Sequence, residues 1–171
     1  MSKPNVIYIV AHDLGQELGT YGSGFQTPNL DQFGNEGVVF TQAVCTSPAC
    51  SPSRGCAMTG MTAHSNGLVG LANPGAIWSL PQETKTIVDD FNESGYETVH
   101  SGMQHERLKG RSNRYQRELD TGGWVEDAVD GAIDYLKNRS DDDAPFYLNL
   151  GTNEVHSGQW ETYKFDRKHN M

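Results

Sequence analysis

The sequence predicts an α/β fold in which helices flank a doubly wound, mostly parallel sheet. Continuous apolar runs at 5–11 and 145–150 are typical of strands buried on both faces of such a sheet. A shorter strand is expected over 96–100, and amphipathic helical patterns lie between these strands. Because strands that alternate with helices pair in parallel through right-handed crossovers, these observations together indicate a doubly wound sheet.

The first helices are expected from their end signals and their apolar periodicity. Thr27 can cap a helix that has Pro28 in its first position and that ends between Gly34 and Gly37. A later helix is expected within 79–95, where an apolar stripe is followed by a glycine stop.

The remaining segments follow from pattern and composition. A helix is expected over 126–139 because its apolar residues share one face, namely Val125, Val129, Ile133 and Leu136. Residues 38–44 are expected to form another strand, which leads into the loop before Cys50. The run 61–81 is rich in Gly, Asn and Ser and is expected to be a surface loop.

The composition is that of a globular domain. The 171 residues suffice for one domain with a workable core, and 36% of them are hydrophobic. The net charge of -9 argues against nucleic acid or an anionic membrane as the partner. The sequence shows neither a membrane-spanning run nor a signal-peptide pattern, so a cytoplasmic protein is expected, and a trimmed periplasmic or secreted parent stays open. Three cysteines do not make a disulfide framework.

One stretch places a nucleophile and a cation on the same element. In Cys50-x-Pro52-x-Arg54, a loop is expected to turn into a short helix that Ser51 caps, that has Pro52 in its first turn, and that ends at Gly60. Cys50 then lies beside the orphan N–H groups of a helix N-terminus, which favour an anion. Arg54 lies about one turn further on and can point at the same anion.

Taken singly, these residues are weak evidence, because a lone cysteine is most often a small buried hydrophobe. Cys45 and Cys56 are interpreted in that way. The joint pattern, closed by Thr59-Gly60, resembles the modification motif of the sulfatases, in which the cysteine is oxidised to formylglycine. The resemblance implies that Cys50, as a hydrated aldehyde, is the nucleophile. It also implies a formylglycine-generating enzyme as a partner.

Other segments resemble sulfatases in the same order along the chain. Thr27-Pro28-Asn29-Leu30-Asp31 and Glu36-Gly37-Val38-x-Phe40 precede the modification motif, and the resemblance runs from Pro4 to His156. It implies the N-terminal part of the alkaline-phosphatase-like sulfatase fold. Residues 1–171 are therefore expected to be a partial catalytic domain, without the later Asp-Asn metal pair, a further Lys and the small C-terminal sheet of full sulfatases. An incomplete metal site and an exposed sheet edge that favours a homo-oligomer are expected.

His12 and Asp13 follow the first expected strand, at the edge where open α/β sheets bind ligands. The commonest use of such an aspartate is to cap the next turn. Sulfatases have an Asp-Asp pair here that binds a divalent cation, so the resemblance implies a metal site, usually for Ca²⁺, formed by Asp13, His12 and Cys50. His12 departs from the pattern, because Ca²⁺ prefers oxygen ligands, and it biases the site toward a metal that accepts imidazole.

Histidines also follow the later strands. His105 matches the sulfatase histidine that helps proton transfer, and His156 matches one that binds sulfate. Met103 replaces the usual sulfate-binding lysine, and Lys109 or Arg107 could compensate.

Two further segments are candidates for substrate contact. The stretch 64–71 resembles the sulfamidase branch, which makes His64 and Asn66 candidate substrate-binding residues, although a loop histidine is usually only solvated. The basic run 107–117 could contact an anionic sugar, although most such runs are simply solvated.

These residues predict a hydrolase of sulfate esters or sulfamates on sulfated sugars. One hydroxyl of the hydrated aldehyde at position 50 would attack sulfur, and the second would be deprotonated to expel sulfate. Arg54 would hold the charge, and His105 and His156 would serve proton transfer and the sulfate. A phosphonate or phosphate-ester hydrolase with the same motif, and an inactive truncated fragment, stay open as alternatives.

Overall fold

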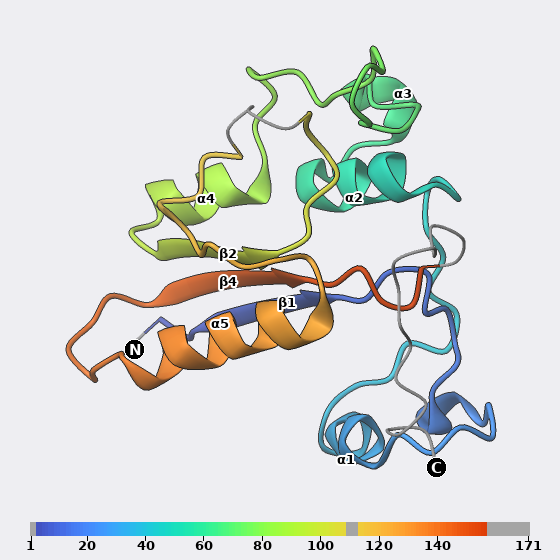
Figure 1. The fold of residues 1–171 in the computed structure, drawn as a ribbon, viewed down its shortest axis with the longest axis vertical. Coiled ribbons are helices and arrows are strands. Elements are labelled where there is room, and N and C mark those ends of the chain that lie inside the picture. The colour runs from blue at the N-terminus through green and yellow to red at the C-terminus, as the bar shows by residue number, and fades with distance from the viewer. Residues whose placement is uncertain (1–2, 109–112, 157–171) are drawn as a thin grey trace.

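The computed structural model describes residues 3–108 and 113–156, and a four-stranded parallel sheet lies at its centre (Figure 1). The strand order is β1-β4-β2-β3, and every pair is parallel. The strands are β1 Val6–Val10, β2 Glu97–Gly102, β3 Arg117–Glu118 and β4 Phe146–Gly151. In the register, Gly151 lies opposite Val10 on one side and Gly102 on the other, so the carboxyl ends of three strands are level.

Helices cover both faces of this sheet, as the doubly wound prediction requires. The helices are η1 Gly19–Tyr21, α1 Pro28–Glu36, α2 Cys50–Thr59, α3 Ala63–Asn66, α4 Ile87–Glu93 and α5 Val125–Lys137. Figure 1 shows α5 on one face and α2 and α4 on the other. None of the helices in the described residues is both long and apolar enough to cross a membrane.

The face under α5 is closed by small residues of the helix. Ala128 and Ala132 are buried against Val99 of β2 and against alternate residues of β4. The predicted stripe is wrong for Val125, Ile133 and Leu136, which are partly exposed. The buried stripe lies next to it on the helix, because alanines let the helix backbone approach the sheet more closely than large side chains do.

The opposite face is packed by aromatic side chains. Tyr147 of β4 is buried with Met58 of α2 and Val88 of α4, and its ring stacks on that of Phe91 at a centroid distance of 4.3 Å. Thr86 and Asp89 form a capping box that starts α4. The helix predicted within 79–95 is thus confirmed, although it occupies only the second half of that range.

β1 is less buried than its sequence predicts. Its side chains were expected to be covered on both faces, yet Ile7 is 47% and Ile9 is 64% exposed. The reason is the position of the strand, because β1 lies at the edge of the sheet and the described helices pack over β2 and β4. The central strand β4 is buried along its whole length, as predicted.

Two predictions about the middle of the chain are wrong. Residues 38–44 form turns and irregular chain rather than a strand, and Val38, Phe40 and Val44 are exposed. The segment pairs with no strand in the described residues, and an apolar run without a partner strand cannot satisfy its backbone groups as a strand. The run 61–81 contains α3 and a buried apolar cluster rather than a surface loop throughout, the cluster being Leu68, Ala72 and Leu80.

Arg107 supports the loop before α4 from inside the protein. It is 2% exposed, and its guanidinium donates hydrogen bonds to the backbone oxygens of Leu80, Pro81 and Thr84. Buried carbonyl groups require such donors. Arg107 therefore does not compensate for the lysine that Met103 replaces.

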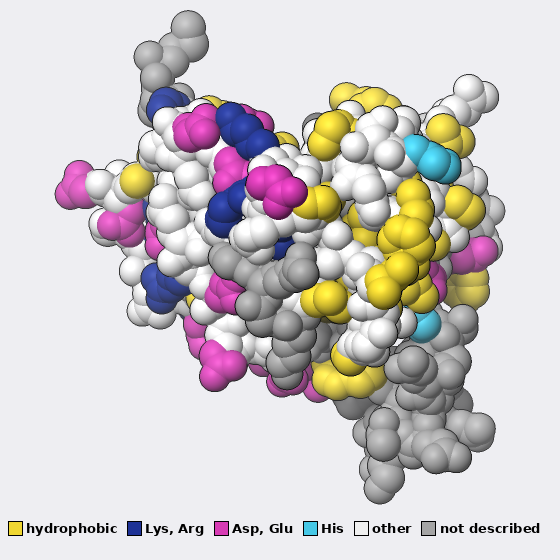
Figure 2. All heavy atoms as spheres, turned by 90° about the horizontal axis from the view of Figure 1, so that it is seen from above, with side chains coloured by type: hydrophobic (Ala, Val, Ile, Leu, Met, Phe, Trp, Pro, Cys, Tyr) yellow, Lys and Arg dark blue, Asp and Glu magenta, His cyan; other side chains and the backbone are white. Residues whose placement is uncertain are grey.

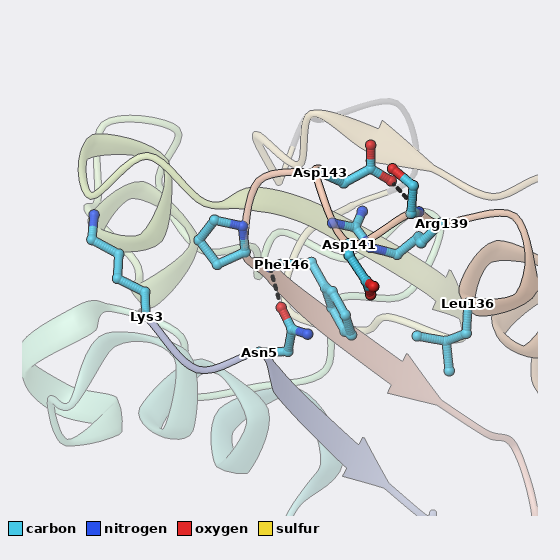
Figure 3. A pocket seen from close by; sticks show the side chains of 9 residues that line it. Lys3, Asn5, Leu136, Arg139, Asp141, Asp143 and Phe146 are labelled. Atoms are coloured by element: carbon cyan, nitrogen blue, oxygen red, sulfur yellow. Dashed lines mark hydrogen bonds between the residues drawn. The ribbon is translucent and has the colours of Figure 1, made fainter. Parts of the chain in front are cut away.

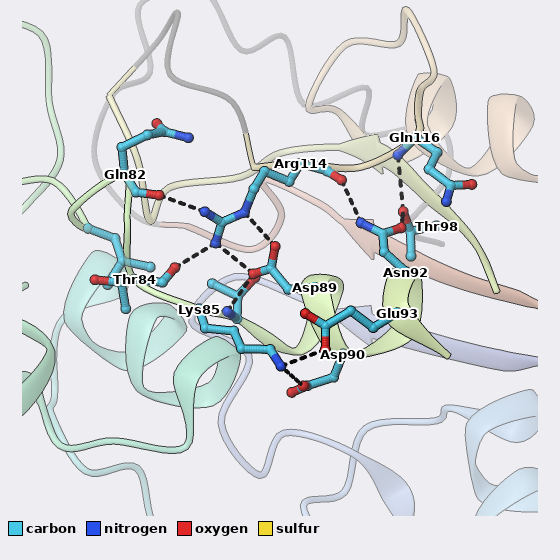
Figure 4. Close-up of polar contacts among 12 residues, drawn as sticks. Gln82, Thr84, Lys85, Asp89, Asp90, Asn92, Glu93, Thr98, Arg114 and Gln116 are labelled. Atoms are coloured by element: carbon cyan, nitrogen blue, oxygen red, sulfur yellow. Dashed lines mark hydrogen bonds and ion pairs between the residues drawn. The ribbon is translucent and has the colours of Figure 1, made fainter. Parts of the chain in front are cut away.

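Arg114 is also engaged within the fold (Figure 4). Its guanidinium donates to the backbone oxygen of Thr84, and its Nε lies 2.6 Å from Asp89 Oδ1. The guanidiniums of Arg107 and Arg114 are therefore bonded within the fold, which supports neither of the two readings of the basic run 107–117, contact with an anionic sugar or simple solvation. Lys109 and Arg111 lie outside the described residues.

Candidate active site

The candidate site lies at the carboxyl edge of the sheet, where the sequence places its polar side chains. His12 and Asp13 follow β1, His105 follows β2, and His156 follows β4. Cys50 is the first residue of α2, the helix drawn above this edge in Figure 1. Level strand ends bring residues from distant parts of the chain together, as in open α/β sheets generally.

Backbone hydrogen bonds extend the pairing of β1 and β4 beyond the strands. The N–H of Thr152 donates to Val10 O at 3.0 Å, the N–H of His12 donates to Glu154 O at 2.8 Å, and the N–H of Val155 donates to His12 O at 2.7 Å. These bonds hold the two loops side by side, so the rings of His12 and His156 meet edge to face with centroids 4.3 Å apart.

Two glycines allow the loop that carries His105 to approach β4. A Cβ on Gly102, whose φ is +86°, would lie 2.1 Å from Gly151 O, and a Cβ on Gly151 would lie 2.0 Å from Met103 O. Neither contact is sterically allowed, so glycine is required at both positions. The Arg54 Nη1 atom lies 3.5 Å from the same Cβ position of Gly151, which places this guanidinium at the sheet edge.

The local structure of α2 follows the prediction at most positions. Pro52 lies in the first turn, and Gly60 ends the helix in the left-handed region, with φ of +67°. The predicted cap is wrong, because the helix begins at Cys50 after Ala49, one residue earlier than Ser51 would allow as a cap. The buried hydroxyl of Ser51 instead accepts a hydrogen bond from the N–H of Ala72.

The structure brings five of the predicted residues into one cluster. Cys50 Sγ and one ring nitrogen each of His12 and His105 lie within 4.8 Å of one another. A carboxylate oxygen of Asp13 and ring nitrogens of His12 and His156 form a second group within the same distance. His12 belongs to both groups and therefore lies at the centre of the cluster.

His12 is buried and held by its neighbour in sequence. Its Nδ1 lies 3.0 Å from Asp13 Oδ1, and His156 Nε2 lies 4.0 Å from Asp13 Oδ2. The backbone of Asp13 is in the left-handed region, with φ of +56°, a conformation that aspartate tolerates better than most residues. Burial lowers the pKa of His12 despite the hydrogen bond to Asp13, so the ring is neutral at neutral pH.

The ring of His105 has one nitrogen that is hydrogen-bonded and one that is not. Its Nε2 lies 2.8 Å from Asn73 Oδ1, and its backbone N–H donates to the buried carboxylate of Glu106 at 2.6 Å. Its Nδ1 is buried, and no donor or acceptor in residues 3–108 and 113–156 contacts it. Burial lowers the pKa of His105, and the nearby charge of Arg54 acts in the same direction.

The thiol of Cys50 is a weak nucleophile in this environment. Burial raises the pKa of Cys50, the charge of Asp13 adds to this effect, and Arg54 only partly opposes it. Because the thiolate is the reactive form of cysteine, the side chain is mostly an unreactive thiol at neutral pH.

Two residues of the sulfamidase-like stretch, Asn66 and His64, have surroundings different from those of the cluster residues. Asn66 is buried, its Nδ2 donates to Thr59 Oγ1, and its Oδ1 accepts from the N–H of Leu68, so its amide supports the local fold. His64 is an exposed residue of α3. His64 does not belong to either group of ligand atoms found in the described residues.

The described residues do not fit a Ca²⁺ site by themselves. Ca²⁺ takes roughly six to eight oxygen ligands. The two groups of ligand atoms in the described chain contain a single carboxylate, that of Asp13, and one of its oxygens is already paired with His12. The remaining ligand atoms are imidazole nitrogens and one sulfur.

A hollow lies at the opposite end of the sheet (Figure 3). It has a volume of 680 Å³ and is lined by residues that precede β1 and β4, among them Lys3, Asn5 and Pro145. One of its polar side chains is used within the fold, since the N–H of Phe146 donates to Asn5 Oδ1. No cysteine or histidine among the described residues lines this hollow, so the reactive site is assigned to the cluster around Cys50 by its chemistry.

The charged surface offers no second candidate on the face shown in Figure 2. Lys and Arg side chains are mixed with Asp and Glu on one part of this face, and apolar side chains gather on the other. Arg114, Lys85 and Arg139 pair with acidic neighbours. A surface of mixed charge does not produce a strong electric field that would attract an anionic ligand. The attraction for an anion must therefore come from local contacts at the cluster around Cys50.

The fold is shared with solved sulfatase structures. A sulfatase from Bacteroides thetaiotaomicron VPI-5482 is similar, with a TM-score of 0.74 and 25% sequence identity, and a 2-O GAG sulfatase has a TM-score of 0.75 and 26% identity. Each match covers 91% of this chain and 36% of the other. The parallel sheet with its flanking helices is thus the N-terminal part of the sulfatase architecture.

The chain belongs to the sulfatase family, whose family model matches residues 4–170. Arylsulfatase D of Homo sapiens is 37% identical over 112 residues, and an N-acetylgalactosamine-6-O-sulfatase of B. thetaiotaomicron is 37% identical over 105 residues. These alignments cover 61% and 60% of this chain and 19% and 20% of the relatives. The chain therefore spans about a fifth of the length of the curated relatives it matches.

Proposed function

We propose that the protein is a sulfuric-ester hydrolase acting on sulfated sugars, with a formylglycine formed from Cys50. The observation that carries this proposal is the meeting of Cys50, His105, His12 and Asp13 at one sheet edge beside Arg54. The substrate class is supported by two relatives, an N-acetylgalactosamine-6-O-sulfatase and a Delta 4,5-hexuronate-2-O-sulfatase, which are 37% and 34% identical to this chain.

The environment of Cys50 suits an oxygen nucleophile better than a thiol. A thiol at this position is protonated, and sulfur attack on a sulfate ester would leave an S-sulfonate with no second group to expel it. Formylglycine supplies an aldehyde whose hydrate has two hydroxyl groups. His105 has one ring nitrogen within 4.8 Å of Cys50 Sγ, and its Nδ1 has no partner among the described residues, so we assign to it the role of accepting a proton from a hydroxyl at position 50.

Arg54 and His156 have the remaining roles. The guanidinium of Arg54 reaches the same sheet edge from one turn further along α2, where it can hold the sulfate oxygens and the charge that develops on them. His156, beside Asp13 and His12, is placed to contact the sulfate or the leaving group. Because the described residues do not fit Ca²⁺, these roles are assigned to side chains alone.

Sulfate esters rather than sulfamates are the first substrates to test. The sulfamate interpretation depends on the stretch 64–71, where the amide of Asn66 is committed to internal hydrogen bonds. The relatives named above are arylsulfatases and sugar O-sulfatases. A panel of 2-O-, 6-O- and N-sulfated sugars, with sulfate release as the readout, distinguishes sulfate-ester hydrolysis from sulfamate hydrolysis.

The first experiment is an intact mass and a peptide map of the protein made together with a formylglycine-generating enzyme. Conversion of the Cys50 thiol to an aldehyde is expected to lower the mass of its peptide by about 18 Da. When the variants are made together with the same enzyme, Cys50→Ala, which cannot be converted, abolishes sulfate release, and Cys45→Ala, which changes an exposed cysteine, leaves it intact. Turnover that survives in the Cys50→Ala variant would refute the proposal.

A further inference from the structure

Before any conversion, Cys50 lies close to two histidines. Its Sγ and one ring nitrogen of each of His12 and His105 are within 4.8 Å of one another. A cysteine and two histidines are the donor set of zinc sites, whereas Ca²⁺ and Mg²⁺ require oxygen ligands.

The second nitrogen of each histidine is hydrogen-bonded in the way that metal sites require. The amide oxygen of Asn73 can only accept, so Nε2 of His105 carries the hydrogen and the buried, unpartnered Nδ1 has the lone pair. The carboxylate of Asp13 also accepts, so Nδ1 of His12 carries the hydrogen and Nε2 has the lone pair. Such outer partners fix the tautomer and orientation of metal-binding histidines.

We propose that the protein with unconverted Cys50 binds Zn²⁺ through His12, Cys50 and His105, oriented by Asp13 and Asn73. Zinc bonds of about 2.1 Å to nitrogen and about 2.3 Å to sulfur place tetrahedral ligands about 3.5 Å apart. The three ligand atoms lie within 4.8 Å of one another, so small rotations of the side chains close the site. Three protein ligands leave the fourth zinc position open.

The charges near the site oppose one another. The positive charge of Arg54 opposes the binding of a metal cation, whereas the negative charges of Asp13 and of the Cys50 thiolate favour it. The charges of Arg54 and Asp13 both act on Cys50. On binding, the thiol proton passes to solvent and the sulfur becomes a thiolate ligand. Conversion of Cys50 to formylglycine removes this sulfur, so zinc binding and conversion exclude each other. The zinc site goes beyond the proposed function, which concerns the converted protein.

The test uses Co²⁺ and Zn²⁺ alone on protein made without the formylglycine-generating enzyme, with the thiol confirmed by mass and metals removed by a chelator. Co²⁺ is expected to give the visible bands of a tetrahedral site and a thiolate-to-cobalt charge-transfer band. Zn²⁺ then displaces Co²⁺, whereas Ca²⁺ in about 1,000-fold excess does not. A wild-type protein that binds no Co²⁺, or one from which Ca²⁺ displaces it, overturns the proposal.

Variants then assign the ligands. Cys50→Ala loses the charge-transfer band and binds Zn²⁺ about 100-fold or more weakly, and Asn73→Ala keeps the band but binds about 10- to 100-fold more weakly. Cys45→Ala and His64→Ala, which change exposed residues outside the cluster, match the wild type. A band that persists in Cys50→Ala, or that is lost in Cys45→Ala, overturns the assignment. Far-UV circular dichroism confirms that each variant is folded, and failure of sulfatase activity in converted protein leaves this result unaffected.

Discussion

The two nitrogens of His105 have different surroundings, and the difference gives the residue its proposed role. Nε2 is bound to Asn73, Nδ1 is buried without a partner among the described residues, and one of the two ring nitrogens lies within 4.8 Å of Cys50 Sγ. A positioned proton acceptor contributes about 10²- to 10⁴-fold to a rate. In the converted protein, His105→Ala is therefore expected to lower kcat by about this factor, measured by steady-state sulfate release.

The matched control is Asp142→Asn, which changes an exposed turn residue beyond α5 and should leave kcat unchanged. The peptide mass must show that Cys50 is converted equally in both variants. A His105→Ala variant with the wild-type kcat would show that the ring takes no part in proton transfer.

Most residues of the candidate site could be predicted from the sequence, and the residues that could not be predicted were missed for a physical reason. His12, Asp13 and His105 come directly after apolar runs, and parallel strands bring their carboxyl ends to one edge. Asn73 gave no such signal, because it reaches His105 across 32 residues of chain. Glu106 could have been noticed from its place beside His105, yet its burial depends on the packing around it.

At the scale of elements, the start of α4 depends on one carboxylate. Asp89 accepts hydrogen bonds from the backbone and side chain of Thr86 and pairs with Arg114 (Figure 4). Burial by itself would raise the pKa of Asp89, but the contacts with Thr86 and Arg114 outweigh it, and the pKa is lowered. Because the folded-state pKa is the lower one, this stabilisation is present above about pH 4 and is lost as the pH falls through the folded-state value.

Asp89→Asn is therefore expected to lower the free energy of unfolding by about 1–2 kcal/mol at pH 7, the usual effect of losing a cap and a charged hydrogen bond. The difference from the wild type should shrink as the pH falls below about 4. Urea unfolding followed by circular dichroism at several pH values measures both. Asp90→Asn, at an exposed ion pair with Lys85, serves as the control and should leave the free energy of unfolding nearly unchanged, because exposed ion pairs contribute little to stability. A gap between Asp89→Asn and the wild type that is constant with pH would contradict the assignment.

Elements were predictable where the local pattern and the tertiary contacts agree. The helix that begins at Pro28 and the central strand β4 have both, and both are confirmed, although the side chain of Thr27 makes no cap hydrogen bond to that helix. Residues 38–44 have the apolar pattern of a strand but no pairing partner in the described chain, so the prediction of a strand from that pattern is wrong. The choice of the alanine stripe in α5 likewise depends on how closely the helix approaches the sheet, which periodicity does not encode.

At the scale of the whole molecule, the outer edge of β1 is open in the described chain. β1 pairs only with β4 there, and Ile7 and Ile9 are exposed on the strand. An exposed apolar edge strand is a template for pairing with another chain. We therefore expect the 171-residue chain to self-associate at micromolar concentrations through this edge, as seen by sedimentation velocity over a concentration series.

The substitution Ile9→Lys tests whether the edge is responsible. A lysine on an edge strand opposes pairing because a second chain would have to desolvate its charge, so the variant should sediment as a monomer where the wild type associates. Ile77→Lys adds the same charge at a more exposed position in the loop between α3 and α4, outside the sheet, and should associate like the wild type. If both variants become monomeric, net charge and not the β1 edge controls association. If neither does, the contact lies on another surface of the molecule.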